Sequence, residues 1–347
     1  MRVLITGHCG YIGPVMIRLF HQAGHEVVGY DTGYFRDQIE DASKDCHPDR
    51  EIAGDIRNID EAAFRGIDAV VHLAALSNDP MGDIVAAKTD DINTGGTGRC
   101  GAMAKKAGVR RFVMASSCSL YGASGASAGA LDESAPFAPV SAYARSKVDG
   151  EAALQALADK DFEPVLLRNA TAYGVSARTR LDLVLNNLMA YGYTTGVIRV
   201  LSDGTPCRPM VHIEDISRAA LCAAQAPVGG LKHTVFNVGG RNCNYTVREI
   251  AEIAAAALPG CRIEITGETG GDPRSYKVDF TRALTELPGF DPQWNLEKGA
   301  AELLAWLKLH KPDADDLLGE RYIRLKRIQT LRSSGRIDAD FRWTDHG

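Results

Sequence analysis

The stretch Gly7-His8-Cys9-Gly10-Tyr11-Ile12-Gly13 decides the fold of this chain. It follows the short apolar run 2–6, which is typical of a buried parallel strand, and it precedes a helical pattern of apolar residues. Glycines at these three positions allow a tight turn, a close approach of backbone to phosphate and close helix-on-strand packing. The free N–H groups at the start of the helix attract a phosphate. The sequence therefore predicts a dinucleotide-binding turn formed by Gly7, Gly10, Tyr11, Ile12 and Gly13.

Asp31 ends the next strand-like run, residues 26–30, about 20 residues beyond the turn. A carboxylate at that position accepts hydrogen bonds from the hydroxyl groups of the adenosine ribose. It also repels a 2′-phosphate, so NAD is favoured over NADP as the cofactor. Arg36 is the counter-argument, because it is either a counter-charge for such a phosphate or a solvated charge of the loop.

Strand-like and helical patterns alternate through the first half of the chain. Further strands are predicted at 51–53, 68–73, 111–115 and 164–168, and helices near 58–66, 91–107 and 141–159. Such alternation predicts a parallel sheet with helices on both faces, which is a Rossmann-type doubly wound α/β fold. The second half is less regular, with strands at 197–200, 235–238 and 263–265 and helices near 181–191, 214–224 and 247–257.

We expect two structural parts. A cofactor-binding domain is predicted at 1–175, with parts of 205–240, and a smaller substrate-binding lobe at 176–204 and 241–347, which includes a C-terminal helix. The segment 321–331 forms an amphipathic pattern that predicts a helix docked on the body or on a second subunit. The low-complexity segment 122–130 is either a lid or a plain surface connection.

Composition excludes several classes of function. The chain has 347 residues and a net charge of −5, which gives no reason to expect nucleic acid or an anionic membrane as partner. No apolar run approaches the roughly 20 residues of a membrane helix, and the start of the chain does not resemble a signal peptide. Eight cysteines without Cys-x-x-Cys spacing indicate reduced thiols and a cytoplasmic protein. The nine histidines form no pair at metal-ligand spacing, so no metal site is predicted.

Tyr143 and Lys147 form the candidate catalytic pair. They are four residues apart in a helix-favouring stretch, so both side chains lie on one helix face. An ammonium there would stabilise the phenolate of Tyr143, whose free pKa of roughly 10 is too high for a base at neutral pH. Such a tyrosine beside a cofactor can accept a proton from an alcohol as hydride leaves its carbon.

Motifs along most of the chain resemble the extended short-chain dehydrogenase/reductases of the nucleotide-sugar epimerase/dehydratase group. They are Thr6-Gly7-x-x-Gly10-Tyr11-Ile12-Gly13, Asp31, Gly54-Asp55-Ile56-Arg57, His72-Leu73-Ala74-Ala75, Asn93-x-x-Gly96-Thr97, Ser116-Ser117-x-x-x-Tyr121-Gly122, Tyr143-x-x-x-Lys147, Leu167-Arg168, Tyr173-Gly174, Gly204-Thr205-Pro206-Cys207-Arg208, Val211-His212-x-x-Asp215 and Gly271-Asp272-Pro273-Arg274. The order of these matches makes a chance Tyr-x-x-x-Lys spacing a poor explanation.

The resemblance implies a set of cofactor contacts beyond the glycine-rich turn and Asp31. The implied residues are Asp55, Ile56, Leu73, Ala74, Ala75, Asn93, Ser116, Tyr143 and Lys147. Asp55 would accept a hydrogen bond from the exocyclic amine of adenine, and Lys147 would bind the nicotinamide ribose. Asn93 either supports the active site or only packs or caps its helix.

The resemblance also implies how a nucleoside-diphosphate sugar is bound. Ser117 matches the catalytic Ser/Thr, which would hydrogen-bond the sugar hydroxyl or ketone together with Tyr143. Arg208 and Arg274 match positions whose guanidinium groups bind the substrate diphosphate, for which permanently charged bidentate donors are well suited.

Two departures from the family pattern bear on the reaction. Dehydratases of the family carry an acidic pair directly after the catalytic Thr, whereas this chain has Cys118-Ser119. A serine is a poor base without a partner, so the dehydratase interpretation loses support, and Cys118 is either a shifted acid–base group or a packing thiol. Thr171 stands where the family often has an Asn that contacts phosphate, so its hydroxyl makes that contact or another group does.

The segment after Thr171 offers further substrate contacts. Arg178 or Arg180, near a helix start, is assigned to the sugar or its phosphates, with solvated helix charges as the alternative. Asn187 is part of an Asn-Leu pair like that of the family's substrate helix. Cys118 and Ser119 are included in the candidate substrate-binding set.

Taken with the resemblance, these patterns predict NAD-dependent hydride transfer at C4 of a nucleoside-diphosphate sugar, with 4-epimerisation as the leading reaction. A 4-dehydrogenase or ketoreductase is the alternative, followed by a 4,6-dehydratase and a non-catalytic NAD-binding regulator. The family leads us to expect a homodimer, although the sequence does not prove it.

Overall fold

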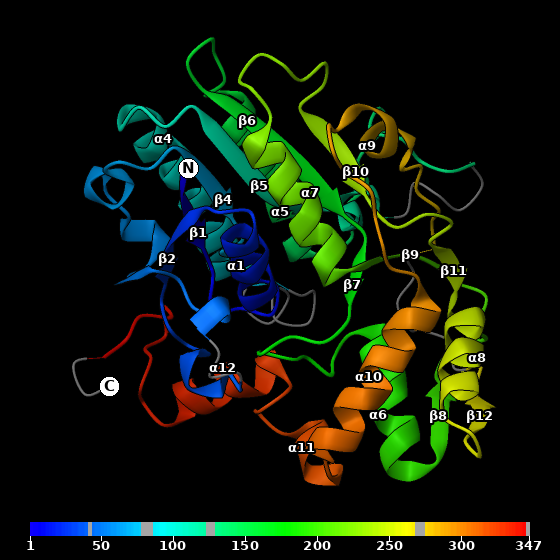
Figure 1. Ribbon diagram of the computed structural model, residues 1–347. Helices are drawn as coiled ribbons and strands as arrows, with labels where there is room; N and C mark the ends of the chain where they lie inside the picture. Colours follow the sequence, from blue (N-terminus) through cyan, green and yellow to red (C-terminus); the bar gives the residue numbers. More distant parts are fainter. Residues whose placement is uncertain (41–43, 78–85, 123–128, 268–274, 345–347) are drawn as a thin grey trace.

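The computed structural model describes residues 1–40, 44–77, 86–122, 129–267 and 275–344 (Figure 1). Its main layer is a sheet of seven strands in the order β10-β6-β5-β4-β1-β2-β3, and all neighbouring pairs are parallel. In that order the strands are β10 (Val235–Val238), β6 (Glu163–Asn169), β5 (Arg111–Ser117), β4 (Ala69–His72), β1 (Arg2–Thr6), β2 (Glu26–Asp31) and β3 (Arg50–Ala53). The predicted Rossmann-type layer is confirmed.

The strand order reverses beside β1, which pairs with β2 on one side and with β4 on the other. In a doubly wound sheet this reversal opens a crevice at the carboxyl ends of the strands. The central strands form because their apolar residues are buried on both faces: Val3, Leu4 and Ile5 of β1 have no exposed surface.

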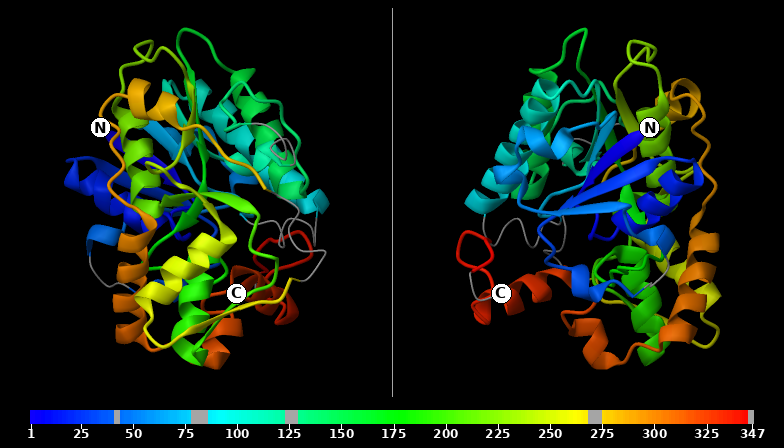
Figure 2. Two further views of the ribbon diagram at one scale, coloured as in Figure 1. Left: turned by 90° about the vertical axis from the view of Figure 1, so that its right-hand side faces the viewer. Right: turned by 60° about the vertical axis from the view of Figure 1, so that its left-hand side comes forward.

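Helices cover both faces of this sheet (Figures 1 and 2). On one face α1 (Gly13–Gln22) contacts α7 (Ile213–Gln225), and both bury apolar residues in one core cluster with β1. The other face is covered by α4 (Gly96–Lys106) and α5 (Ala142–Gln155). A short helix α3 (Ala86–Thr89) and a π-helical turn η5 (Asp90–Gly95) lead into α4.

The smaller lobe lies beyond the carboxyl ends of the sheet (Figure 1). Its core is formed by α6 (Val184–Thr195), α8 (Val247–Ala257), α10 (Leu296–His310), α11 (Ala314–Leu318) and the parallel pair β8 (Val197–Val200) and β12 (Arg262–Ile265). Three strands, β7 (Thr171–Tyr173), β9 (Cys207–His212) and β11 (Asn244–Thr246), form a mixed sheet. Helix α9 (Thr281–Glu286) contacts β10. The cavity described below therefore has walls from both parts.

Local signals explain the ends of the lobe helices. A capping box between Thr246 and Glu249 begins α8, and the side chain of Asn295 accepts a hydrogen bond from Lys298 N at the start of α10. Gly196 ends α6 in the left-handed conformation, with φ of 73°. No helix in the described ranges is both long and apolar enough to cross a membrane.

The helix predicted near 58–66 is wrong. That segment contains only two 3-10 turns, η3 (Ile56–Asn58) and η4 (Glu61–Phe64). Each turn has its own N-cap, because the side chain of Asp55 accepts from Arg57 N and that of Asp60 accepts from Ala62 N. Two caps five residues apart, with extended backbone between them, prevent one continuous helix.

The C-terminal helix docks on the nucleotide-binding layer. Helix α12 spans Arg324–Ser333, and its residues Ile328 and Leu331 are buried in a core cluster with Tyr34 and Phe35 from the loop after β2. The amphipathic stripe predicted for 321–331 therefore packs on the body of the same chain. The proposed domain boundaries remain a prediction, but this helix does not contribute only to the smaller lobe.

We predict opposite effects for two Gly→Ala substitutions in helices. A methyl group on Gly13 would lie 2.0 Å from the carbonyl oxygen of His8, whereas one on Gly98 would meet only the Ala153 side chain at 3.6 Å. Gly13→Ala should lower the free energy of unfolding by about 1–3 kcal/mol, and Gly98→Ala should raise it by about 0.5–1 kcal/mol. Urea denaturation of both variants tests this, and an unchanged Gly13→Ala midpoint would contradict the packing argument.

Candidate nucleotide-binding and catalytic site

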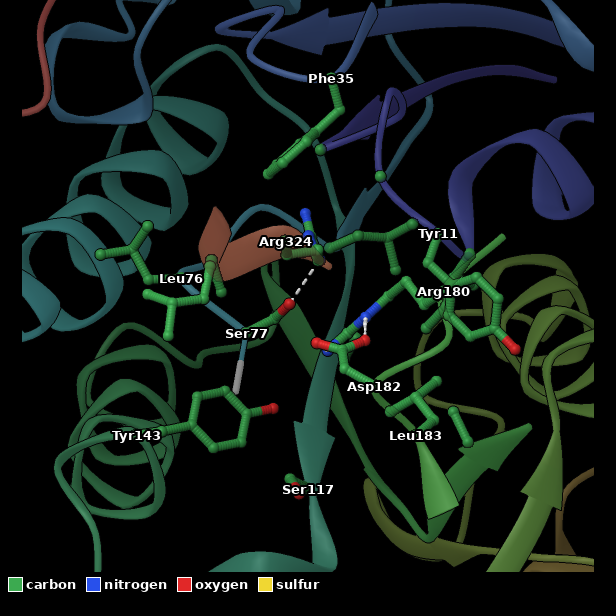
Figure 3. A pocket seen from close by; sticks show the side chains of 18 of the residues that line it. Tyr11, Phe35, Leu76, Ser77, Ser117, Tyr143, Arg180, Asp182, Leu183 and Arg324 are labelled. Carbon is green, nitrogen blue, oxygen red and sulfur yellow. Dashed lines mark hydrogen bonds and ion pairs between the residues drawn. The ribbon is translucent and has the colours of Figure 1, made fainter. Parts of the chain in front are cut away.

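A cavity of about 990 Å³ lies at the carboxyl ends of the central strands. Its described lining includes the glycine-rich turn, the ends of β2 and β5, the start of α5 and the lobe segment before α6. Figure 3 shows Tyr143 and Ser117 near one another, with Arg180 and Asp182 across the cavity from them. The fold therefore brings together the predicted cofactor and catalytic residues.

The glycine-rich turn requires glycine for steric reasons. Gly7 has φ of 76°, and a methyl group there would lie 2.6 Å from the backbone nitrogen of Ala74. Gly10 N donates to the carbonyl oxygen of Gly7 at 3.0 Å, which closes the turn just before α1. Gly7, Gly10, Tyr11 and Ile12 line the cavity, whereas Gly13 is buried behind it at the first position of the helix.

Asp31 lines the cavity with its carboxylate held in place. One oxygen accepts from Cys9 N at 3.0 Å and the other from Gly33 N at 2.7 Å. Arg36, the counter-argument raised by the sequence, donates from Nη2 to Oε1 of Glu51 at 2.6 Å. Its charge is therefore engaged by a carboxylate of β3.

Glu51 also brings together a cluster that sequence spacing did not indicate. Ligand-type atoms of His8, Cys9 and Glu51 lie within 4.8 Å of one another. His8 Nε2 lies 3.0 Å from Oε1 of Glu51, the same oxygen that Arg36 binds. Burial and the nearby carboxylates raise the pKa of the Cys9 thiol. These contacts form a hydrogen-bonded support beneath the glycine-rich turn.

The other predicted cofactor residues fall into two groups. Those at the cavity surface are Asp55, Ile56, Leu73, Ala74, Ala75, Ser116, Tyr143 and Lys147. The Asp55 carboxylate also accepts from Arg57 Nη2 at 2.6 Å. Asn93 is not among the described lining residues. Its side-chain oxygen accepts a hydrogen bond from Leu76 N, and its side-chain nitrogen donates to the carbonyl oxygen of Leu76 and to the hydroxyl oxygen of Ser146. The structure therefore gives Asn93 a supporting position behind the cavity.

The catalytic candidates meet at the end of β5 and the start of α5. Ser141 caps the helix by accepting from Ala144 N at 3.1 Å, which places Tyr143 in the first turn. Lys147 Nζ lies 5.7 Å from the centroid of the Tyr143 ring and donates to the carbonyl oxygen of Ala115 at 2.7 Å. Burial lowers the pKa of Lys147 to about 8.

A buried ion pair holds β5, β6 and α5 in register behind these groups. Arg168 of β6 donates from Nη2 to Glu151 of α5 at 2.7 Å, and the hydroxyl of Ser116 donates to the same carboxylate. Arg168 also donates to the hydroxyl oxygen of Tyr121 at 3.1 Å. Loss of either ionic partner would leave a buried charge, so this network fixes the backbone that carries Ser117.

Cys118 does not reach the cavity. It is buried in the core, and its thiol donates to the carbonyl oxygen of Arg168. Burial raises its pKa well above the ordinary value, which opposes an acid–base role. Cys118 is therefore a packing thiol of the core, and the prediction that it contacts the substrate is wrong. Ser119 and Thr171 do line the cavity.

The arginines expected to contact substrate have separate positions. Arg180 lines the cavity and forms a bidentate pair with Asp182, with Nε at 2.8 Å from Oδ1. Arg178 is fully buried and is not among the described lining residues; it lies over Phe35, with Cζ 5.0 Å from the ring centroid. Asn187 and Arg208 line the cavity, and Arg274 lies outside the described residues.

Sequence reasoning missed several lining residues from distant segments. The described ones with polar or aromatic side chains include Tyr34, Phe35, Ser77, Tyr191, Tyr276 and Arg324. Arg324 begins α12, and its Nη1 donates to the hydroxyl of Ser77 at 2.5 Å (Figure 3). Helical periodicity predicted that α12 would dock, but no local signal showed where it would do so.

The chain belongs to the NAD dependent epimerase/dehydratase family, whose model matches residues 3–239. A UDP-glucose 4-epimerase of Streptomyces lividans is 30% identical over 91% of this chain and 98% of the relative. A dTDP-glucose 4,6-dehydratase of Streptomyces niveus is 28% identical over 89% of this chain and 93% of the relative.

Solved structures agree with this family. MoeE5 in complex with UDP-glucose and NAD is 28% identical, with a TM-score of 0.74 over 90% of this chain and 100% of that chain. The NDP-hexosamine 5,6-dehydratase TunA has a TM-score of 0.78 at 23% identity, covering 91% of this chain and 99% of that chain. NAD is therefore the cofactor, and the glycine turn and oriented Asp31 carboxylate fit its pyrophosphate and adenosine ribose.

Asp31→Ser should weaken NAD binding about tenfold or more, because it removes charge-assisted hydrogen bonds to the ribose. The affinity for NADP should fall less or rise, because the repulsion of its 2′-phosphate is removed. Calorimetric titration of both nucleotides measures the ratio. Glu26→Gln, at the opposite end of β2, makes the same charge change as a control. An unchanged NAD-to-NADP ratio in Asp31→Ser would contradict this assignment.

Proposed function

We propose that this protein is a nucleoside-diphosphate-sugar 4-epimerase that uses NAD. The observation that carries the proposal is the convergence of Ser117, Tyr143 and Lys147 on the cavity that also contains the dinucleotide-binding turn. The UDP-glucose 4-epimerases among the relatives, matched over about nine-tenths of this chain, support the same reaction.

Tyr143 is the proposed base. Figure 3 shows its hydroxyl directed toward the middle of the cavity. Lys147, on the same helix face, supplies a positive charge that favours the phenolate. Tyr143 would take the proton of the sugar C4 hydroxyl, and Ser117 would hydrogen-bond the same oxygen as it becomes a ketone. Returning the proton from Tyr143 completes the cycle.

Bound NAD would supply the hydride acceptor for C4 and the donor that returns the hydride. Inversion requires the sugar to present its other face before the hydride returns, so the cavity must allow the sugar to turn while the nucleotide stays fixed. Arg208, which lines the cavity, is proposed to bind the diphosphate, together with Arg274 outside the described residues. Asn187 and Thr171 also line the cavity and are proposed substrate contacts.

The acid groups of the cavity argue against dehydration. The carboxylates among its described lining residues are Asp31, Asp55 and Asp182. Backbone N–H groups hold Asp31, and Arg57 binds Asp55. Burial would raise the pKa of Asp182, but Arg180 reverses this effect and lowers it. None of these groups directly follows Ser117, where dehydratases of the family carry their acid pair.

We also propose that the enzyme acts in the cytoplasm as a homodimer and that nucleic acid is not a partner. None of the eight cysteines, all of which lie in the described ranges, forms a disulfide bond, as expected in a reducing compartment. The net charge of −5 disfavours binding to nucleic acid. The homodimer rests on the family resemblance.

A panel of UDP-, dTDP-, GDP- and CDP-sugars tests the reaction by mass spectrometry and NMR. An unchanged mass with inverted C4 couplings is expected for at least one sugar. Loss of two hydrogens would indicate a dehydrogenase and loss of water a dehydratase, and either result would replace the proposal. Tyr143→Phe should lower kcat by about 10²-fold or more, and unchanged turnover in this variant would exclude Tyr143 as the base.

Lys147→Met should move the acidic limb of the kcat/KM profile to higher pH by about 1–3 units. The reason is that Tyr143 loses the cation that favours its phenolate, so a higher pH is needed for the same phenolate fraction. Initial rates between pH 5 and 10 at saturating NAD measure the shift. Lys106→Met, an exposed lysine of α4 paired with Glu61, is the matched control. A lower rate with no movement of the limb would show that Lys147 only binds the cofactor.

A further inference from the structure

Three guanidinium groups lie together at the cofactor end of the cavity, where the carboxylates of Asp182, Asp31 and Glu40 stabilise them only in part. Arg178, Arg180 and Arg324 come from two distant segments, and Arg180 is the member paired with Asp182. Loss of solvent, with repulsion from Arg180 and Arg178, lowers the pKa of Arg324 to about 9. A guanidinium nonetheless stays protonated at neutral pH, so three positive charges are concentrated there.

Arg178 is the buried member of this group. It is 2% exposed, and its Nε and Nη2 atoms have no hydrogen-bond partner in the described structure. Buried donors of this kind are normally satisfied. Because Arg178 is not among the described lining residues, its charge adds to that of Arg180 and Arg324 only through space.

The position of Arg324 shows which anion would fit. A methyl group on Gly10 would lie 3.5 Å from Arg324 Nη2, so the guanidinium faces the glycine-rich turn. Its other terminal nitrogen, Nη1, donates to Ser77 in the loop after β4. Its Cζ lies 4.4 Å from the centroid of the Phe35 ring, which fixes its plane. Arg324 thus bridges the two loops that flank a pyrophosphate in this fold.

The segment that carries Arg324 is anchored to the adenosine side of the cavity. Trp343 Nε1 donates to the carbonyl oxygen of Thr32 at 2.6 Å. The hydroxyl of Tyr34 donates to the carbonyl oxygen of Phe341. Arg327 donates from Nε to the carbonyl oxygen of Tyr34 at 3.1 Å. Thr32 and Tyr34 line the cavity just after Asp31, so the segment 323–343 closes over this half.

Further contacts fasten the same segment to neighbouring loops. Arg342 Nη1 lies 3.9 Å from the Asp55 carboxylate, and Lys88 of α3 pairs with Asp340. Figures 1 and 2 show α12 below the carboxyl ends of β1 and β2, where the glycine-rich turn lies. Ile323, Leu325 and Ile328 add apolar lining beside Arg324. A dinucleotide in the cavity would therefore be covered by this segment.

We propose that Arg324 binds the NAD pyrophosphate opposite the glycine-rich turn, and that the segment 323–343 is a cover that keeps NAD bound between turnovers. Permanent charge and a planar fork suit Arg324 to bridge two phosphate oxygens. Retention fits a reaction that returns its hydride to the substrate and does not need to exchange cofactor. Only this argument for retaining NAD between turnovers rests on the proposed epimerase function.

Binding of cofactor fragments tests the role of Arg324 without any sugar turnover. Arg324→Met should weaken binding of ADP-ribose about 10- to 100-fold, because one charge-assisted contact to phosphate is lost. Adenosine, which has no phosphate, should bind Arg324→Met and wild type equally, and so should UDP. Arg241→Met, an exposed arginine outside this segment that pairs with Asp291, should match wild type. Calorimetry on nucleotide-free protein gives these constants.

Three results would overturn the assignment. Equal losses for adenosine and ADP-ribose would mean that Arg324 only supports the adenosine pocket. A loss for UDP with ADP-ribose unchanged would place Arg324 on the substrate diphosphate, and no change for any ligand would remove it from binding. Arg324→Lys, which keeps the charge but not the planar fork, should retain part of the affinity for ADP-ribose. Thermal unfolding of Arg324→Met and Arg324→Lys shows whether both variants are folded.

The cover is tested by the rate of NAD release. Trp343→Ala removes the bond to Thr32 without removing a phosphate contact. Trp343→Ala should accelerate the exchange of bound NAD for labelled NAD without changing how the exchange rate depends on salt. Arg324→Met should also accelerate the exchange, and the rate should depend less on salt because a contact between charges is lost. Exchange in Trp343→Ala at the wild-type rate would show that the segment does not control release. If no nucleotide sugar were converted in the panel above, the affinities for ADP-ribose and the rates of NAD exchange would still test the role of Arg324 and of the cover.

Discussion

The close approach of the backbone at Gly7 to Ala74 is the constraint on which the site depends. A side chain at residue 7 would lie 2.6 Å from a backbone nitrogen, so the turn after β1 fits beside the β4 loop only as glycine. This contact lies where the strand order reverses and where the crevice opens. The cofactor loops, Tyr143 on α5 and the lobe segment with Arg180 all face that crevice.

Electrostatics divides the cavity into two functional ends. At the catalytic end Lys147 is buried against the carbonyl oxygen of Ala115, and its charge favours proton transfer through Tyr143. At the cofactor end the guanidinium groups of Arg178, Arg180 and Arg324 lie together, and Asp182 pairs with Arg180. Packing on Phe35 holds Arg178 and Arg324, and Arg324 also donates to Ser77, so a bound diphosphate would add negative charge beside these cations.

Local patterns predicted the elements whose signals are contained in one segment. The strand at residues 2–6 and the helix at 247–257 have the predicted bounds, because apolar periodicity and turn residues define them locally. The helix predicted near 58–66 does not form because Asp55 and Asp60, five residues apart, each cap a separate short turn. The burial of Cys118 and the docking of α12 depend on neighbours far along the chain, which periodicity does not report.

The sequence by itself predicted the doubly wound fold from alternating strand and helix patterns and the dinucleotide-binding turn from its glycine spacing, because both signals are local. The Tyr143/Lys147 pair rested on its helical spacing together with the ordered motifs of the family. Only the tertiary structure decided that Arg180 lines the cavity while Arg178 is buried behind Phe35, and that Arg324 reaches the turn from more than 300 residues away. The physical reason is that direction and burial of a side chain depend on which elements pack against it. A long-range contact of that kind leaves no periodic trace in the residues on either side.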